Sequence, residues 1–151
     1  MTTREIAVRQ ATVADLNLLV PLFDDYRRFY RQPSAPEQAR RFLMERFKHS
    51  ESVIFLAFDD AAAIGFTQLY PSFSSSAMAR ILVLNDLFVA PDARRRGAGS
   101  ALLQAAARYG RDAGAVRLVL STEMANTAAQ LVYERMGWKR DTVFCVYHLA
   151  L

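Results

Sequence analysis

The feature that most constrains the fold of this chain is an apolar segment followed by a basic, glycine-containing turn and then a helical pattern. Residues 80–89, RILVLNDLFV, read as a strand buried on both faces, which is typical of the middle of a sheet. Residues 94–100, RRRGAGS, come next, and apolar residues then recur at helical spacing as far as Gly114. A strand buried on both faces needs helices on both sides of its sheet.

Strand and helix patterns alternate along the rest of the chain. Thr12 is a candidate N-cap, Pro21 is expected to bend the first helix, and Ser34 opens a capping-box pattern. The expected order is strand 6–11, helices 13–30 and 34–49, strands 52–58, 62–73 and 80–89, helix 98–113, strand 116–122, helix 126–136 and strand 142–151. This order predicts one domain, residues 1–151, with a mixed parallel and antiparallel sheet flanked by helices, an α/β (mixed α+β) fold.

Composition and charge exclude several classes of protein. Hydrophobic residues make up 52% and charged residues 23% of the 151 residues, which is an ordinary globular balance. The first residues lack the apolar core of a signal peptide, and no apolar run approaches membrane-spanning length, so we expect a cytoplasmic protein that does not enter membranes. The net charge of +4 comes without aromatic residues among the clustered arginines at 94–96, which argues against nucleic-acid binding.

Cysteine and histidine residues suggest no special chemistry. Cys145 is the single cysteine and lies in an apolar run, so we expect it to pack in the core. His49 and His148 are far apart and have no neighbouring ligand residues at metal spacing, so no metal site is expected.

The basic turn is suited to an anion. Glycine lets the backbone approach a ligand closely, and a strand–turn–helix unit aims backbone N–H groups and the positive helix end at a phosphate. The turn does not match a P-loop, because Ser100 and Ala101 follow the last glycine, nor a dinucleotide fingerprint, because Leu102 replaces the third glycine. A solvated basic turn is the alternative.

Two segments resemble the signature motifs of the GNAT family of N-acetyltransferases. In LNDLFVAPDARRRGAGSALL, residues 84–103, Arg94, Gly97 and Gly99 occupy the positions of the pyrophosphate loop. In NTAAQLVYERMGW, residues 126–138, Asn126 opens a helix and Tyr133 lies near its end. The strand–helix order of the remaining chain agrees with this family.

The resemblance implies a GNAT fold with about six to seven strands, in which two parallel strands splay apart to bind acetyl-CoA as co-substrate. The pantetheine arm would bond to strand backbone, and N–H groups of residues 95–100 would surround the pyrophosphate. The implied acetyl-CoA-binding residues are Leu87, Phe88, Val89, Arg94, Arg95, Arg96, Gly97, Ala98, Gly99, Ser100, Asn126 and Tyr133.

The implied reaction is direct attack of an amine on the thioester carbonyl. The tetrahedral oxyanion needs a hydrogen-bond donor and the departing thiolate needs a proton. Backbone N–H groups near Phe88 and Val89 are the candidate donors to the oxyanion, and Tyr133 is the candidate proton donor to the sulfur.

The sequence leaves open which group deprotonates the amine. A lysine-like amine has a pKa near ~10.4, so making it neutral near pH 7 costs roughly 4.6 kcal/mol. Asp86 is a candidate catalytic residue, although strand alternation would place Asn85 and Asp86 on opposite faces. Related polyamine acetyltransferases carry Glu at the position of Asn85, and Asn cannot take a proton. Asp86, Glu123 or a water chain could serve, and Asp86 could also be a structural charge at the strand end.

The acceptor is suggested by LFDDYRRFYRQ, residues 22–32, which resembles the first-helix segment of polyamine and small-amine acetyltransferases. The acidic pair Asp24 and Asp25 and the aromatic residues Tyr26 and Tyr30 of this segment are candidates for the acceptor side, although most of them could form a solvated face. The candidate substrate-binding residues are Asp25, Tyr30, Asn85 and Glu123. We therefore expect an N-acetyltransferase acting on a small amine or polyamine-like acceptor, as a homodimer. A protein or peptide amine is the alternative acceptor, and a non-catalytic acyl-CoA-binding module is the alternative to an enzyme.

Overall fold

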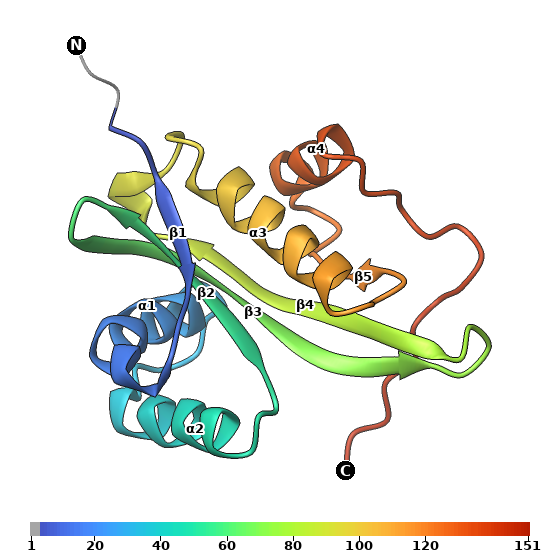
Figure 1. Cartoon of the computed structure of the whole chain (residues 1–151), viewed down its shortest axis with the longest axis horizontal. Coiled ribbons are helices and arrows are strands. Elements are labelled where there is room, and N and C mark those ends of the chain that lie inside the picture. The colour runs from blue at the N-terminus through green and yellow to red at the C-terminus, as the bar shows by residue number, and fades with distance from the viewer. Residues whose placement is uncertain (1–3) are drawn as a thin grey trace. The chain divides into compact units, whose positions relative to one another are not determined.

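The computed structural model describes residues 4–151 (Figure 1). The chain forms two compact units, and the boundary along the sequence falls between residues 120 and 121. The elements of the first unit are β1 (Ala7–Gln10), a 3₁₀ turn (Val13–Asp15), α1 (Leu16–Phe29), α2 (Pro36–Lys48), β2 (Val53–Asp59), β3 (Ala62–Ser74), β4 (Ala79–Val89), a second 3₁₀ turn (Pro91–Ala93), α3 (Ala98–Asp112) and β5 (Leu118–Val119). The second unit contains α4 (Thr127–Arg135).

The first unit is built on one mixed sheet, as the sequence predicts. Its order is β1-β2-β3-β4-β5, with antiparallel pairing up to β4 and parallel pairing between β4 and β5. The described residues form five strands, so the expectation of six to seven is wrong. The segment expected as a strand over 116–122 pairs with β4 only at Leu118 and Val119.

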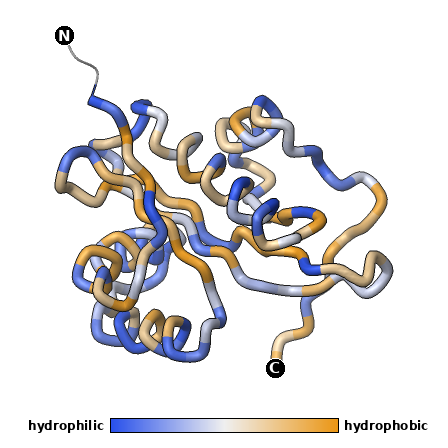
Figure 2. Tube along the Cα trace, viewed as in Figure 1, coloured by the Kyte–Doolittle hydropathy of each residue, from blue (hydrophilic) through white to orange (hydrophobic). Residues whose placement is uncertain are grey.

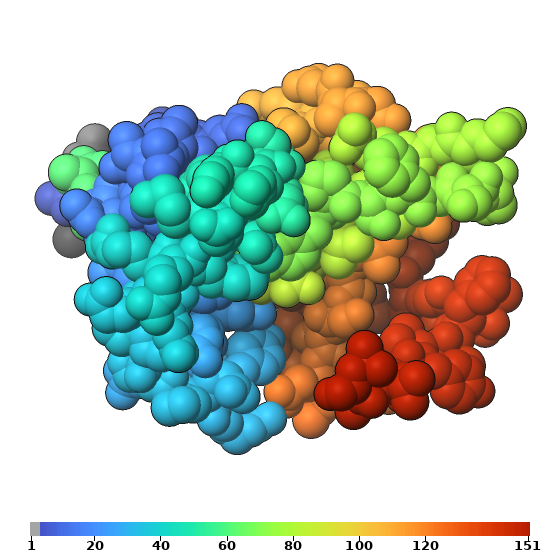
Figure 3. All heavy atoms as spheres, turned by 90° about the horizontal axis from the view of Figure 1, so that it is seen from below, coloured from blue at the N-terminus to red at the C-terminus, as the bar shows by residue number. Residues whose placement is uncertain are grey.

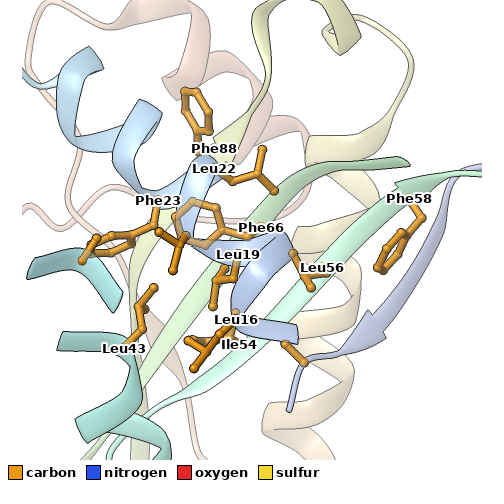
Figure 4. Close-up of a cluster of buried hydrophobic side chains, with 13 residues drawn as sticks. Leu16, Leu19, Leu22, Phe23, Leu43, Ile54, Leu56, Phe58, Phe66 and Phe88 are labelled. Carbon is orange, nitrogen blue, oxygen red and sulfur yellow. The ribbon is translucent and has the colours of Figure 1, made fainter. Parts of the chain in front are cut away.

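Alternate side chains of β2 face two different helical layers. Ile54, Leu56 and Phe58 join the apolar cluster beneath α1 and α2, where Figure 4 shows Leu19 and Leu43 near Ile54. Phe55 contacts Tyr109 of α3 instead, with ring centroids 5.9 Å apart. The strand is therefore buried on both faces, and the helices hold the sheet between them.

The start of the first helical segment is fixed by a capping box. The Thr12 side chain accepts from the Ala14 N–H, and the Asp15 carboxylate accepts from the Thr12 N–H at 2.8 Å, which confirms Thr12 as an N-cap. Arg9 donates to both oxygens of Asp15 at 2.8 and 2.9 Å. This pair ties β1 to the helical segment that follows it.

The connection between α1 and α2 is organised by Asp24 rather than by a second capping box. Ser34 donates its hydroxyl to Asp24 at 2.6 Å, and the Ala35 N–H donates to the same carboxylate at 2.7 Å. The expected capping box at Ser34 is therefore wrong, and α2 begins with Pro36 in its first turn. In Figure 3 this connection and α2, coloured blue to cyan, cover one face of the first unit.

The end of the chain departs from its sequence pattern. Residues 142–151 form no strand in the described structure, and Cys145 is exposed, so both expectations are wrong. Figure 2 shows this stretch as largely hydrophobic, but no described strand pairs with it. A period-two pattern produces a strand only where a partner offers backbone hydrogen bonds. At the start of this stretch, the chain forms a turn in which the Asp141 carboxylate accepts from the Val143 and Phe144 N–H groups.

Among residues 4–151, no helix is long and apolar enough to cross a membrane.

Replacing Asp15 tests the capping box. The Arg9 side chain and the Thr12 backbone hold the pKa of Asp15 at about 2, below its usual value, so its stabilisation is complete above about pH 4 and is lost as the pH falls toward 2. Asp15→Ala should lower the free energy of unfolding by ~1 kcal/mol at neutral pH, and by less in acid. Denaturant titrations at several pH values measure this, with the exposed Asp112→Ala as control. An equal loss at every pH would contradict the assignment.

Candidate active site

The candidate site begins at a β-bulge in β4. Gln68 pairs with Asp86 and Leu69 pairs with Leu84, so Asn85 is an extra residue without a partner on β3. A bulge breaks the regular alternation of side chains. Asn85 and Asp86 consequently line the same cavity, and the Asn85 amide donates to the Asp86 carboxylate at 2.9 Å. The expectation that these two side chains lie on opposite faces is wrong.

The cavity has a volume of about 490 Å³ and is bounded by α1, α2 and the strands β3 and β4. Four of its nine lining residues are aromatic, and Figure 4 shows one of them, Phe23, next to Phe66 of the core. The lining residues are Phe23, Tyr26, Arg27, Gln38, Ala39, Phe42, Tyr70, Asn85 and Asp86.

Asp86 is the buried acid of this cavity, with 2% of its surface exposed. Burial raises the pKa of its carboxyl, although hydrogen bonds from Gln68, Asn85 and Tyr26 oppose the rise. The Gln68 amide donates at 2.5 Å and is itself fully buried, while its Oε1 atom has no hydrogen-bond partner. Asp86 is thus a carboxyl that can hold or release a proton at a higher pH than a surface aspartate.

Two tyrosines beside Asp86 stay neutral. Burial, helped by the negative charge of Asp86, raises the pKa of Tyr26 and raises that of Tyr70 to about 12. Both phenols therefore act as neutral hydrogen-bonding groups near pH 7.

The acidic residues of α1 do not line the cavity. Asp24 is buried and bonded to the α1–α2 connection, and the pKa of its carboxyl is lowered chiefly by the Ser34 hydroxyl. Asp25 is exposed and lies 3.8 Å from Arg28. Tyr30 lies outside the cavity lining and packs edge-on against Tyr26, with ring centroids 5.1 Å apart.

Sequence reasoning missed six of the nine lining residues: Phe23, Arg27, Gln38, Ala39, Phe42 and Tyr70. Arg27, Phe42 and Tyr70 come from separate elements, and only the packing of those elements brings them to one cavity. Gln68, which donates to Asp86, could have been singled out from the sequence. It is an amide side chain within an apolar strand run, and a buried polar side chain needs a hydrogen-bond partner.

The end of β4 leads into the basic turn at the start of α3. Gly97 has a φ of 85°, a left-handed conformation suited to glycine, and Arg95 has a φ of 65°. The first intrahelical bond runs from the Ala101 N–H to the Gly97 carbonyl at 3.0 Å. The N–H groups of residues 98–100 therefore lack intrahelical partners and point out of the positive helix end, where a phosphate binds well.

The three arginines of the turn have different partners. Arg94 donates to the Val89 carbonyl at 3.0 Å, and its guanidinium lies over the Phe88 ring at 5.7 Å. Arg96 donates to Asp59 at 2.6 Å. Arg95 forms no hydrogen bond or ion pair with the described residues. Two arginines thus hold the turn against the sheet, and each keeps further N–H donors.

The edge of β4 next to β5 is open over its last residues. Pairing with β5 covers only Leu82 and Val83, whereas β4 continues to Val89. The backbone of Leu87–Val89 is paired with β3 on one side and has no β5 partner on the other. This edge fits an extended chain carrying amide groups, such as pantetheine.

The second unit contains the remaining predicted site residues. Asn126 accepts from the Ala129 N–H at 3.2 Å and so caps α4, as expected. The Glu123 carbonyl accepts from the Gln130 side chain at 3.2 Å. Tyr133 packs near Trp138, with ring centroids 6.2 Å apart.

A second cavity, of about 520 Å³, lies at the other end of the sheet, next to Arg80 and Tyr109. No group of three or more His, Cys, Asp or Glu residues suited to a metal ion occurs within residues 4–151.

Asp86→Asn tests the burial of the carboxyl. Because the folded carboxyl has a raised pKa, the free energy of unfolding should fall as the pH rises from about 4. Asn removes the buried charge, and the unpartnered Gln68 Oε1 atom can accept from its amide after rotation. The variant should therefore be at least as stable as the wild type at pH 7 and should lack this decline. Denaturant titrations measure both effects, with exposed Asp25→Asn as control. Marked destabilisation of Asp86→Asn at pH 7 would show that Asp86 stabilises the fold in its charged form.

Comparison with known proteins identifies the family of this chain. The model of the acetyltransferase (GNAT) family matches residues 19–138. YhfO of Bacillus subtilis, an uncharacterized N-acetyltransferase, is 49% identical over 94% of this chain and 95% of its own. The crystal structure of a probable acetyltransferase shares 46% identity and a TM-score of 0.91, covering 96% of this chain and 97% of that one.

A more distant neighbour is an aminoglycoside N-acetyltransferase whose structure contains CoA. It shares 22% identity and a TM-score of 0.79, covering 97% of this chain and 96% of that one, so it supports the fold. The chain therefore belongs to the GNAT family of acetyltransferases, enzymes that use acetyl-CoA.

Proposed function

We propose that the protein transfers the acetyl group of acetyl-CoA to a small primary amine bound in the cavity beside Asp86. The observation that carries this proposal is the placement of a buried acid immediately before the open edge of β4. Asp86 and Phe88 are two residues apart on one strand, a separation of about 7 Å. The same short segment can therefore present a base to the amine and backbone groups to the thioester.

The coenzyme is proposed to lie along β4 and the start of α3. The backbone of Leu87–Val89 would bond to the pantetheine arm, and the free N–H groups of residues 98–100 would bind the pyrophosphate. Arg95 would add positive charge, together with the remaining donors of Arg94 and Arg96. Bound acetyl-CoA supplies an activated thioester, and the chain supplies alignment and proton transfer.

In the proposed reaction, the amine nitrogen would give a proton to Asp86 and form a bond to the carbonyl carbon, which places the electron pair of the carbonyl on its oxygen. Collapse of this tetrahedral oxyanion would then break the carbon–sulfur bond. Backbone N–H groups near Phe88 and Val89 would stabilise the oxyanion. Tyr133 would give a proton to the thiolate, and Asn126 would keep its role in coenzyme binding by starting α4. Glu123 stays the alternative base, and Asn85 would orient Asp86 through the hydrogen bond of their side chains.

The lining of the cavity narrows the sequence-based prediction of the acceptor. The cavity supports a small acceptor, whereas the polyamine-like acceptor relied on Asp25 and its neighbour, which lie outside the lining. A homodimer and a cytoplasmic location stay predictions from the sequence.

Thiol release from acetyl-CoA in the presence of primary amines tests the function. General-base catalysis typically contributes about a hundredfold or more, so Asp86→Asn should lower kcat by about that factor. It should also remove the acidic limb of the pH–rate profile, which reflects the raised pKa of Asp86. Asp25→Asn is the matched control, because that acid lies outside the cavity. Wild-type turnover in Asp86→Asn would remove Asp86 from the mechanism, and no thiol release with any amine would reject the function.

Gly99→Glu tests coenzyme binding at the turn. A side chain at Gly99 meets no atom within 4 Å, and a negative charge in the first turn of α3 favours the helix. The variant should fold with unchanged or slightly higher stability, yet lose the thermal stabilisation by CoA, which is about 2.7 kcal/mol at a hundredfold excess over Kd. The control is Gln104→Glu, which adds the same charge at an exposed position farther along the helix. Equal stabilisation of both variants by CoA would place the pyrophosphate elsewhere.

A further inference from the structure

The charges that line the cavity identify the class of acceptor. We infer that the acceptor carries a carboxylate in addition to its amine, on a short apolar body, with the amine directed to Asp86 and the carboxylate to Arg27. This inference rests on the proposed function, because it assigns the substrate of the same site.

The cavity presents one acid and one permanent cation to its ligand. Asp86 is the single acidic lining residue and Arg27 the single basic one, among the residues that the structure describes. The other polar lining groups, including the phenols of Tyr26 and Tyr70, are neutral at pH 7. A ligand that matches this lining therefore has one positive and one negative group.

Arg27 is held in place by the backbone of the α1–α2 connection. Its Nη1 atom donates to the Pro33 carbonyl at 2.9 Å, which leaves the other guanidinium donors for a further partner. The nearest acid on its own helix face, Asp24, interacts with Arg27 electrostatically but directs its oxygens to Ser34 and Ala35. Asp25, the next acid, lies against Arg28. Arg27 therefore offers a carboxylate two parallel N–H donors without first breaking an ion pair.

The lining also argues against a polycation. A second ammonium group on the acceptor would meet the Arg27 guanidinium and no second acid, and like charges brought together are destabilising. The same cavity is also lined by Phe23, Ala39 and Phe42, which favour an apolar body on the ligand. Hydrophobic amino acids and short ω-amino acids meet these requirements.

Pairs of acceptors that differ only in the carboxylate test the inference. We would measure kcat/KM by thiol release for phenylalanine against phenethylamine, for 6-aminohexanoate against hexylamine, and for spermidine. A hydrogen-bonded charge pair changes affinity by about tenfold or more, so the carboxylate member of at least one pair should be preferred by that factor. Both enantiomers of phenylalanine should be included, since either can offer the two groups.

Arg27→Gln should lower the ratio of kcat/KM for the carboxylate member to that for its amine partner by about tenfold. Arg27→Glu should shift the preference toward spermidine. Arg28→Gln is the matched control, because it removes the same charge from the next position of α1, where the side chain lies outside the cavity. This control should leave the ratio as in the wild type.

Two results would overturn the inference. One is a wild-type preference for amines without a carboxylate, and the other is an equal effect of Arg27→Gln on both members of each pair. Neither result affects the proposed function, which instead fails if no amine releases thiol from acetyl-CoA.

Discussion

A strand cannot direct two consecutive side chains to one face unless its ladder is interrupted, and β4 is interrupted at Asn85. The extra residue brings the Asn85 amide and the Asp86 carboxylate to the same cavity, where they form a hydrogen bond of 2.9 Å. It also allows β4 to keep its pairing with β3 on both sides of the bulge. The position of the acid beside Asn85 depends on this interruption, and the unpaired edge of β4 and the turn into α3 follow it along the chain.

Burial gives the acid its chemical character. Asp86 is 2% exposed, and the free-energy cost of a charge in that position raises the pKa of its carboxyl. The fully buried Gln68 and the half-buried Tyr26 donate to the carboxylate, so the charged form is still accessible. A carboxyl with a raised pKa is better matched to an amine at neutral pH than an aspartate with an ordinary pKa, so the role that we propose for Asp86 as base depends on the apolar packing around α1 and α2.

The basic turn combines a structural role with the binding role that we propose for it. Arg94 and Arg96 attach it to the end of β4 and to Asp59, whereas Arg95 has no such attachment. Gly97 allows the backbone to reverse in a left-handed conformation before α3 begins. The N–H groups at the helix start are thereby held in one arrangement, and a preorganised donor set binds an anion at a lower entropic cost than a mobile one.

The sequence alone determined the features that depend on local spacing. The strand at 80–89, the turn with Gly97, the helix that follows and the Thr12 and Asn126 caps were predictable, because each depends on residues close together in the chain. Two predictions from strand alternation were wrong. Residues 142–151 form no strand because they have no strand partner among residues 4–151, and Asn85 and Asp86 do not lie on opposite faces because they lie at a bulge. The tertiary structure decided which polar groups meet. Arg27, Tyr70 and Asp86 come from α1, β3 and β4, and only the packing of these elements on one core sets their distance and burial.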